Sequence, residues 1–370
     1  MKKNILIFHQ NMVMGGVEKV TLNILENLSR EKFNIKVVLI EKYGELIEKL
    51  PKDLEIIYLL DKSYSKDKKG LIKFIGYLKE LIVINKKSKK IIKERDILLN
   101  MNARNMRINL LFLKYKNKKI GWIHGNILND FGKISEKFNY KLFNQYSKIF
   151  NISKQGKKDF DDKFPKLKNK SELLYNSFNI EGIIKKSKEE IINEKDYLLS
   201  IGRLSYEKGF DLLIDTIFLL KKDGIEEKLY IIGDGEEKEN LKKQIEKLNL
   251  ENNVFLLGFK ANPYPWLKNS KLYILSSRGE GLPTVLIEAL ACQKAIVSAN
   301  CLCGPREILD NGKYGLLVET ENSSALKEGI KKLLLDKELK ENYENKSLKR
   351  AYDFSNENIL KKLEREISDL

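Results

Sequence analysis

Two glycines near the start of the chain could present backbone N–H groups to a phosphate. The segment Met14-Gly15-Gly16-Val17-Glu18 separates an apolar run at residues 5–8 from a stretch with helical periodicity. A helix that begins at such a loop offers unpaired N–H groups and the positive end of its dipole. Gly15 and Gly16 therefore form a candidate phosphate-binding loop, with a plain strand-to-helix turn as the alternative. The spacing fits neither a P-loop nor a dinucleotide fingerprint.

Two cations in the second half of the chain follow another apolar run. Residues 200–210 read SIGRLSYEKGF, which places Arg203 and Lys208 in the loop between a predicted strand and a predicted helix. A guanidinium forms a planar fork on a phosphate, and an ammonium supplies a compact point charge. The alternative is that both are solvated loop cations. Their position at the carboxyl end of a strand, where α/β sheets bind ligands, favours phosphate binding.

Two glutamates lie on either side of a predicted helix start. Residues 279–290 read GEGLPTVLIEAL, so Glu280 lies in a glycine-bracketed loop and Glu288 lies inside a helix with Pro283 in its first turn. An acid among apolar neighbours needs a hydrogen-bonding partner, and the vicinal hydroxyls of a ribose would supply one for Glu288. Glu280 could accept hydrogen bonds from sugar hydroxyls. The alternative is a solvated loop acid and a helix acid favoured by the dipole.

One histidine lies where a predicted strand of the first half ends. His124 follows the run at residues 119–123 and precedes Gly125 and Asn126. An imidazole there could hydrogen-bond a sugar or an acceptor, or act as a base near neutral pH. A lone histidine is also a common packing residue. We predict a functional role for His124 and rank it above His9, which ends the first strand.

Candidate metal ligands are sparse. Asp159-Phe160-Asp161 could ligate a divalent ion, but the two acids lie in a charged amphipathic stretch and are expected to face water. Two histidines and three cysteines, without a CxxC pair, predict neither a zinc site nor a disulfide framework. We therefore expect no metal and no cofactor.

Strand-length apolar runs alternate with helix-length amphipathic segments along most of the sequence. This pattern is typical of βα units around parallel sheets, and 370 residues suffice for about two domains. A charged, weakly periodic stretch at 176–196 separates two such series. The expected strands lie at residues 5–8, 35–40, 55–59, 97–100, 119–123, 148–152, 197–201, 228–232, 254–257, 272–275, 295–298 and 315–318.

The alternation predicts an α/β fold of two doubly wound domains in tandem. We place them at residues 1–180 and 181–354, with the final helix at 355–370 packing back on the first domain. The carboxyl ends of both sheets would then face one central cleft, where ligands of such folds usually bind.

A basic segment at residues 62–95 carries twelve lysines and arginines against three acids, a large share of the net charge of +17. Leu71, Ile75, Leu78 and Ile82 recur in it at helical spacing, which predicts a basic amphipathic helix suited to an anionic membrane surface. The alternative is a solvated helix whose apolar stripe is ordinary core. Nucleic acid is disfavoured as a partner because regularly interleaved aromatics and a recognisable binding module are lacking.

The expected location is cytoplasmic, peripheral on the inner face of the plasma membrane. No apolar stretch reaches the length of a membrane span, and the run at 5–8 is too short for a signal peptide. The unpaired pattern of Cys292, Cys301 and Cys303 fits a reducing compartment.

Several motifs occur together along the chain in a fixed order and spacing. They are Gly15-Gly16, Gly202-Arg203 with Lys208-Gly209, Ile232-Gly233-Asp234-Gly235, Gly258-Phe259, the E-x7-E from Glu280 to Glu288, and Gly304-Pro305-Arg306-Glu307. This set resembles the retaining GT4 family of glycosyltransferases over most of the chain, most specifically in the second half. The resemblance implies a GT-B architecture of two Rossmann-like domains, the first binding the acceptor and the second a nucleotide sugar.

The resemblance also implies roles for single residues. Arg203 and Lys208 would neutralise the donor diphosphate, and Glu288 would take the ribose hydroxyls. Glu280 would hold the transferring sugar, and His124 would contact the sugar or the acceptor. The backbone at Gly258 and Phe259 would recognise the base, and the loop from Gly281 would hold the sugar. The expected donor-binding set comprises Gly15, Gly16, Arg203, Lys208, Gly258, Phe259, Glu280, Gly281, Leu282, Thr284 and Glu288.

The expected reaction moves a hexose or N-acetylhexosamine from a nucleotide sugar, with UDP as the expected nucleotide, to a lipid-linked or surface-polysaccharide precursor. Cations and N–H dipoles would stabilise the departing diphosphate without a metal. Same-face attack by the acceptor would retain configuration and need no protein nucleophile. A sugar-nucleotide epimerase, a phosphorylase and a basic nucleic-acid-binding protein stay as alternatives. A glycosidase is disfavoured because hydrolysis has no use for phosphate-directed cations.

Overall fold

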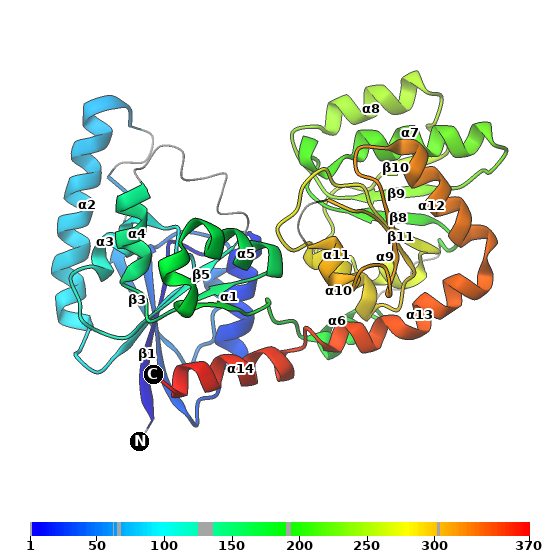
Figure 1. Ribbon diagram of the computed structural model, residues 1–370. Coiled ribbons are helices and arrows are strands. Elements are labelled where there is room, and N and C mark those ends of the chain that lie inside the picture. The colour runs from blue at the N-terminus through cyan, green and yellow to red at the C-terminus, as the bar shows by residue number, and fades with distance from the viewer. Residues whose placement is uncertain (1, 62, 65–67, 125–135, 190–193, 302–303) are drawn as a thin grey trace. The chain divides into compact units, whose positions relative to one another are not determined.

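The chain divides into two units (Figure 1). Unit 1 comprises Met1–Phe178 and Asn356–Leu370, and unit 2 comprises Asn179–Ser355. The computed structural model describes residues 2–61, 63–64, 68–124, 136–189, 194–301 and 304–370. Gly125, Asn126, Cys303 and part of the basic segment lie outside these ranges. The division falls within two residues of the expected boundaries, and the assignment of acceptor and donor to the two units stays a prediction.

The sheet of unit 1 has seven parallel strands in the order β3-β2-β1-β4-β5-β6-β7. The inner strand β1 runs through the core, where Ile5 pairs with Ile35 of β2 on one side and with Ile97 of β4 on the other. Such a strand is covered on both faces, which is why it reads as a continuous apolar run. The strands are β1 (Lys3–His9), β2 (Phe33–Glu41), β3 (Glu55–Leu60), β4 (Ile97–Asn100), β5 (Lys119–Ile123), β6 (Lys148–Asn151) and β7 (Ser171–Leu173).

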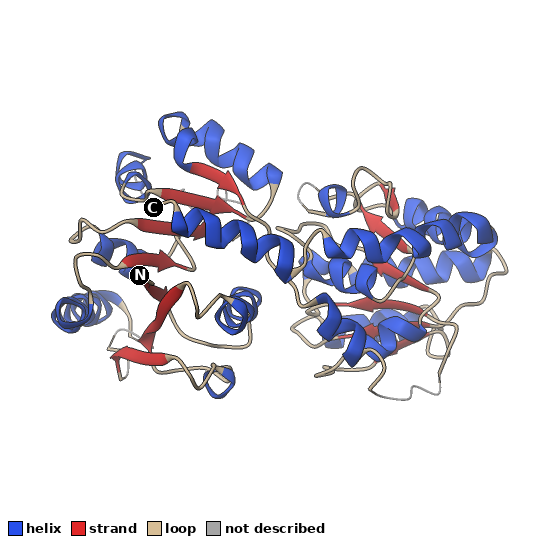
Figure 2. Cartoon of the chain, turned by 90° about the horizontal axis from the view of Figure 1, so that it is seen from below, coloured by secondary structure: helices blue, strands red, loops and turns tan. Residues whose placement is uncertain are grey.

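Helices cover both faces of this sheet (Figure 2). The last helix, α14, belongs to unit 1 and packs against α1. Its carboxylate Glu364 pairs with Lys32 at 2.7 Å, and Asn356 at its start hydrogen-bonds Asn23. The helices are α1 (Gly16–Asn27), η1 (Ile47–Lys49), α2 (Gly70–Ile91), α3 (Met106–Phe112), α4 (Glu136–Asn144), α5 (Lys154–Lys163), η2 (Pro165–Lys170) and α14 (Asn356–Ser368).

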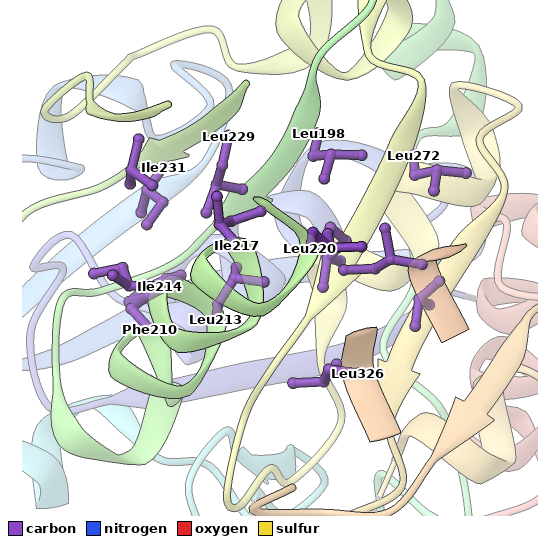
Figure 3. Close-up of a cluster of buried hydrophobic side chains, with 14 of the residues drawn as sticks. Leu198, Phe210, Leu213, Ile214, Ile217, Leu220, Leu229, Ile231, Leu272 and Leu326 are labelled. Carbon is purple, nitrogen blue, oxygen red and sulfur yellow. The ribbon is translucent and has the colours of Figure 1, made fainter. Parts of the chain in front are cut away.

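The sheet of unit 2 has six parallel strands in the order β10-β9-β8-β11-β12-β13. Its core joins helix α7 to the sheet, with Leu213, Ile217 and Leu220 of the helix against Leu198 and Leu229 of the strands (Figure 3). The strands are β8 (Leu198–Ile201), β9 (Leu229–Ile232), β10 (Val254–Leu256), β11 (Leu272–Leu275), β12 (Ile296–Ala299) and β13 (Leu316–Val318). The helices are α6 (Ile180–Lys186), η3 (Tyr206–Lys208), α7 (Phe210–Lys222), α8 (Lys238–Lys247), α9 (Tyr264–Asn269), α10 (Thr284–Ala291), α11 (Pro305–Ile308), α12 (Ser323–Leu335) and α13 (Lys337–Tyr352).

Both sheets follow the doubly wound order, in which strands are added first on one side of the first strand and then on its other side. The reversal lies between β1 and β4 in unit 1 and between β8 and β11 in unit 2. Ligands of such folds bind at the carboxyl ends of the strands at this point. The loops after these four strands are therefore the places to look for a site.

The α/β prediction is confirmed, and all twelve expected strands are present. Strand β7 was not expected, because its three residues carry no clear apolar run. Pro283 precedes α10 as its N-cap instead of lying inside the first turn. No helix in the described ranges is long and apolar enough to cross a membrane.

The apolar stripe of the basic segment lies on the surface of helix α2. Leu71 and Ile82 are 72% and 67% exposed, and Ile75 and Leu78 are exposed as well. The opposite stripe, which includes Glu80 and Ile84, is the one that faces the core of unit 1. The alternative interpretation of the predicted stripe as ordinary core is therefore wrong.

Candidate functional site

A charged contact at the reversal point of unit 2 joins two predicted site residues. Nζ of Lys208, at the end of η3, lies 2.6 Å from Oε1 of Glu280. The hydroxyl of Ser277 donates to the same oxygen at 2.7 Å. The Glu280 side chain is only 8% exposed, whereas that of Lys208 is 29% exposed. The loops after β8 and β11 thus bring a cation and a carboxylate together from positions 72 residues apart.

Backbone contacts hold these two loops in register. Gly209 adopts φ +63°, and a Cβ there would clash with the carbonyl oxygen of Ser276. The Ser276 hydroxyl in turn donates to the carbonyl of Lys208 at 2.9 Å. Gly233 makes a similar close approach to the carbonyl of Gly202. Glycine is required at positions 209 and 233 because a side chain would force adjacent loops apart.

Arg278 also joins these loops, and the sequence analysis missed it. Its guanidinium donates to both carboxylate oxygens of Asp211 at 2.6 and 2.8 Å and to the carbonyl of Tyr206. It also lies 4.0 Å from the centroid of the Tyr206 ring. The hydrogen bonds that Arg278 donates to Asp211 raise the pKa of Arg278. No sequence signal marks this clamp, because its partners lie about seventy positions upstream.

Arg203 does not join the contact between Lys208 and Glu280. Its side chain is 72% exposed, and Nη2 lies 3.0 Å from the exposed carboxylate of Glu236. Such a surface pair holds the guanidinium weakly, since solvent screens it. Arg203 is therefore able to turn toward a ligand.

Glu288 lies half-buried in α10, beside polar groups as well as apolar ones. The hydroxyl of Tyr264 is 3.5 Å from Oε1 of Glu288. Burial, and then the charge of Glu288, raise the pKa of Tyr264, and the same two causes raise the pKa of Cys292 to about 12. The hydroxyl of Tyr264 is therefore a donor that a bound ligand could replace. Nearby on the loop before α10, Leu282 is buried.

The remaining donor-binding candidates of unit 2 lie on neighbouring loops. Thr284 is the first residue of α10, a helix without a side-chain cap. Gly258 follows β10, and its carbonyl accepts from the N–H of Gly233 at 3.0 Å. Phe259 is 64% exposed. Thr284 therefore lies at a helix start and Gly258 follows a strand end, and the exposed ring of Phe259 is open to a planar ligand.

The glycine loop of unit 1 is covered by an acid. Helix α1 starts at Gly16 without a side-chain cap, and a Cβ on Gly15 would clash with Oε2 of Glu18. The Glu18 carboxylate therefore lies against the loop at the helix N-terminus, where a phosphate was expected. Burial raises the pKa of Glu18, and its Oε1 lies 4.0 Å from Nε2 of His9.

Two neutral histidines end the strands next to this loop. Burial lowers the pKa of both His9 and His124 to about 4. Both ring nitrogens of His9, and Nε2 of His124, are buried without a hydrogen-bond partner. The lowered pKa makes His124 a weaker base than a free imidazole, and a catalytic role for it stays a prediction. A neutral imidazole with an open nitrogen remains a hydrogen-bonding partner for a hydroxyl.

Asp159 and Asp161, which were considered as metal ligands and set aside, do not face water, contrary to expectation. Asp159 is buried and accepts from Gln155, and Asp161 pairs with Lys157 at 2.5 Å. In the described part of the chain, no group of three histidine, cysteine or acidic side chains is arranged to hold a metal. Independence from metal stays a prediction.

Comparison with solved structures identifies the class of fold. Anabaena HepE, solved in complex with UDP, superposes with a TM-score of 0.80 at 20% sequence identity, covering 100% of both chains. The structural neighbours are glycosyltransferases of the GT-B class. The two Rossmann-like units described above are those of the GT-B fold.

Sequence comparison then gives the family. The profile described as glycosyl transferases group 1 matches residues 183–350, nearly the whole of unit 2. An uncharacterized glycosyltransferase of Methanocaldococcus jannaschii is 31% identical over 279 residues, 70% of this chain and 68% of that protein. The chain belongs to the group 1 glycosyltransferases.

A relative with a named activity matches over a shorter stretch. It is the N-acetylgalactosamine-N,N'-diacetylbacillosaminyl-diphospho-undecaprenol 4-alpha-N-acetylgalactosaminyltransferase of Campylobacter jejuni, 37% identical over 227 residues. The match covers 61% of this chain and 61% of that protein. The chain thus spans less than two thirds of the length of this relative.

Proposed function

We propose that this protein is a retaining glycosyltransferase that moves a hexose or N-acetylhexosamine from a UDP-sugar to a lipid-linked or surface-polysaccharide precursor. The observation that carries the proposal is the contact of Lys208 with Glu280 at the reversal point of unit 2. Membership of the group 1 glycosyltransferases favours transfer over the epimerase, phosphorylase and nucleic-acid alternatives. The UDP bound to HepE and the lipid-linked substrate named for the Campylobacter relative support the donor and the acceptor class.

The proposed mechanism assigns the departing charge to the loop cations. As the bond to the anomeric carbon breaks, negative charge grows on the diphosphate, and Lys208 and Arg203 stabilise it. Glu280 accepts hydrogen bonds from the hydroxyls of the sugar while the sugar ring carries positive charge. The contact of Lys208 with Glu280 places the cation and the carboxylate side by side before the donor arrives, and the diphosphate then competes with Glu280 for Lys208.

The remaining residues are assigned to the ribose, the base, the sugar and the acceptor. Glu288 exchanges its long contact with Tyr264 for the ribose hydroxyls, and the loop through Gly258 and Phe259 receives the base. The loop containing Gly281, Leu282 and Thr284 contacts the sugar and phosphates. In unit 1, Gly15 and Gly16 contribute N–H groups, and neutral His124 hydrogen-bonds the sugar or the acceptor. No step of this scheme routes through a metal.

A donor panel with a matched pair of lysine variants tests the proposal. Lys271 pairs with Glu227 at 2.9 Å, with side chains 28% and 10% exposed, and so resembles the Lys208 pair in burial. Lys271 precedes β11, at the opposite edge of the sheet. Binding of UDP-sugars, GDP-mannose and ADP-glucose is measured by calorimetry, and transfer to lipid extract by product mass.

We expect Lys208→Ala to lower kcat about 100-fold while Lys271→Ala leaves it unchanged. Both variants lose one ion pair, so a general loss of stability would affect them alike. A folded protein that binds and turns over no sugar nucleotide would remove the enzyme proposal. Equal activity of the two variants would remove the role of Lys208.

We also propose that the protein is cytoplasmic and binds the inner face of the plasma membrane through helix α2. Its exposed apolar residues, led by Leu71, Ile72 and Phe74, share the helix with exposed lysines. Apolar side chains beside basic ones suit the boundary of an anionic bilayer. A lipid-linked acceptor would be met at the same surface.

Sedimentation with vesicles tests this docking. Wild-type protein should pellet with phosphatidylglycerol vesicles and not with phosphatidylcholine vesicles. Leu71→Ser should weaken pelleting, whereas Leu335→Ser should not, because Leu335 is 70% exposed but lies in unit 2 on α12. Equal pelleting with both lipids would reject docking driven by charge.

A further inference from the structure

A pocket of about 790 Å³ lies in unit 1 beside helix α2, and no predicted site residue lines it. Its floor comes from strand ends at the reversal point, with Gln10 after β1, Glu41 ending β2 and Arg107 in the first turn of α3. Its wall comes from α2, with Lys73, Phe74 and Tyr77. We call it the α2 pocket. Its volume is within the range of about 300–1,000 Å³ that is usual for ligand sites.

Hydrogen bonds fix the polar groups of the floor. Asn105 donates to Oε1 of Gln10 at 2.8 Å, and Gln10 donates to Oε1 of Glu41 at 2.9 Å. Arg107 donates to the fully buried Glu80 at 2.7 Å and lies 3.6 Å from Glu41. A connected network of this kind holds its donors and acceptors in one orientation.

The charges of the floor disfavour an anionic ligand there. The one guanidinium, Arg107, is flanked by the carboxylates of Glu41 and Glu80. A phosphate at this depth would meet two negative groups and one positive group. The attraction to Arg107 would therefore not offset the free-energy cost of removing the phosphate from water. A neutral ligand with hydroxyl groups meets no such penalty.

Two groups at the pocket have hydrogen-bonding capacity that no described residue uses. The hydroxyl of Tyr77 is buried without a partner. In the described ranges, the recorded contacts of Glu41 are all made by its Oε1, which leaves Oε2 for a ligand. The rings of Tyr77 and the exposed Phe74 add apolar surface. A carboxylate, a hydroxyl and aromatic faces together match a sugar ring, which is polar at its edge and apolar on its face.

The rim of the pocket continues into the surface proposed to meet the membrane. Phe74 belongs both to the pocket wall and to the exposed apolar face that contains Leu71 and Ile75. Lys73, also exposed, provides the cation at this rim. An amphiphile with a sugar at one end, a phosphate next and a lipid beyond would therefore meet matching chemistry in that order.

We propose that the α2 pocket binds the terminal sugar of the acceptor, with its phosphate near Lys73 and its lipid along the apolar face of α2. This inference rests on the proposed function and deepens it by naming the acceptor subsite. Tyr77 and Glu41 recognise the hydroxyls of that sugar.

A binding experiment on the full chain tests the inference without requiring transfer. Methyl α-glycosides of glucose, galactose, N-acetylglucosamine and N-acetylgalactosamine are the probes, with saturating UDP present so that the donor site is filled. Saturation-transfer NMR reads binding. Tyr77→Phe removes the unpartnered hydroxyl and keeps the ring. Tyr115→Phe is the matched control, since the Tyr115 hydroxyl is also buried without a partner in unit 1 but lies outside the pocket.

We expect at least one glycoside to bind wild-type protein and Tyr115→Phe equally, and Tyr77→Phe about tenfold more weakly. Glu41→Gln should weaken it as well, and inorganic phosphate should not displace it. The inference is overturned if no glycoside binds, if phosphate displaces the glycoside, or if the two tyrosine variants behave alike.

The failure of this inference can be told from failure of the proposed function. If the protein binds and turns over UDP-sugars but gives no pocket-dependent glycoside signal, the proposed function stands and the α2 pocket is rejected as the acceptor subsite. A protein that binds no sugar nucleotide loses the proposed function itself. In transfer assays, Tyr77→Phe should raise the KM for the lipid-linked acceptor and leave the KM for the donor unchanged.

Discussion

The two units differ in whether the polar side chains near the reversal point of the sheet have hydrogen-bond partners. In unit 2, Lys208, Glu280 and Ser277 satisfy one another at the reversal point. In unit 1, both nitrogens of His9 and one of His124 are buried without partners. Among the described residues, every buried side-chain polar atom that lacks a hydrogen bond lies in unit 1.

This difference separates a site that is complete before binding from one that a ligand would complete. A buried polar group without a partner costs stability, so it persists where something else gains from it. The family profile also covers nearly the whole of unit 2 and none of unit 1. This difference fits the proposal that unit 2 binds the donor and unit 1 binds the acceptor.

The largest effect should come from breaking the contact between the loops of unit 2. Gly209→Ala forces a positive φ on a residue with a Cβ and a clash with Ser276, and should lower the free energy of unfolding of unit 2 by about 3 kcal/mol. Gly224→Ala, at φ +77° in open space, should cost only about 1 kcal/mol. Urea unfolding followed by Trp266 fluorescence in a Trp122→Phe background measures both. Equal losses would show that the loop contact contributes nothing.

Next in size is the loss of the paired carboxylate. Glu280→Gln should lower kcat about 100-fold, because the acceptor that holds the sugar loses its negative charge. The same variant should bind free UDP more tightly, since Lys208 is released and a negative charge is removed beside the diphosphate. Kinetics and calorimetry measure the two effects, with Glu227→Gln as the control at the matched pair. Weaker binding of UDP by this variant would contradict the proposal that the diphosphate competes with Glu280 for Lys208.

The buried histidines should make unit 1 sensitive to acid. Because the pKa of His9 is about 4 when folded and about 6.5 when unfolded, the unfolded chain binds more protons between these values. Stability is thus present above pH 6.5 and falls toward pH 4, by about 2 to 3 kcal/mol for His9, which is 3% exposed. His9→Gln should flatten this pH dependence.

Trp122 fluorescence in a Trp266→Phe background measures unit 1 across this pH range. Because the chain contains only two histidines, the double variant His9→Gln/His124→Gln removes all histidine titration. The acid sensitivity of the double variant should be lower still. An unchanged pH dependence would contradict the neutral, buried state of these rings.

The smallest effect on stability is expected at Arg203. Its pair with Glu236 is exposed, so Arg203→Ala should leave the unfolding of unit 2 unchanged. The affinity of the Arg203→Ala variant for UDP should nevertheless fall, as measured by calorimetry. Glu236→Ala breaks the same surface pair and should not weaken UDP binding. Equal behaviour of the two variants would place Arg203 among the solvated loop cations.

The fold and much of the donor loop could be predicted because their signals are local. Buried parallel strands read as apolar runs, and glycines at strand ends mark close backbone approaches such as those of Gly209 and Gly233. Arg278 could not be predicted, since its clamp on Asp211 depends on two loops meeting. The burial of Asp159 was missed because its helix reads as charged throughout. The pKa values of His9 and His124 depend on neighbours that spacing does not reveal.

By itself the sequence determined the two parallel sheets, the positions of the glycine loops and the acids and cations at strand ends, because each depends on a few neighbouring residues. Only the tertiary structure decided which charges meet. It pairs Lys208 with Glu280, lays Glu18 over Gly15, turns the apolar stripe of α2 outward and encloses the α2 pocket. Such contacts join residues far apart along the chain, and burial then sets their protonation and hydrogen-bonding capacity.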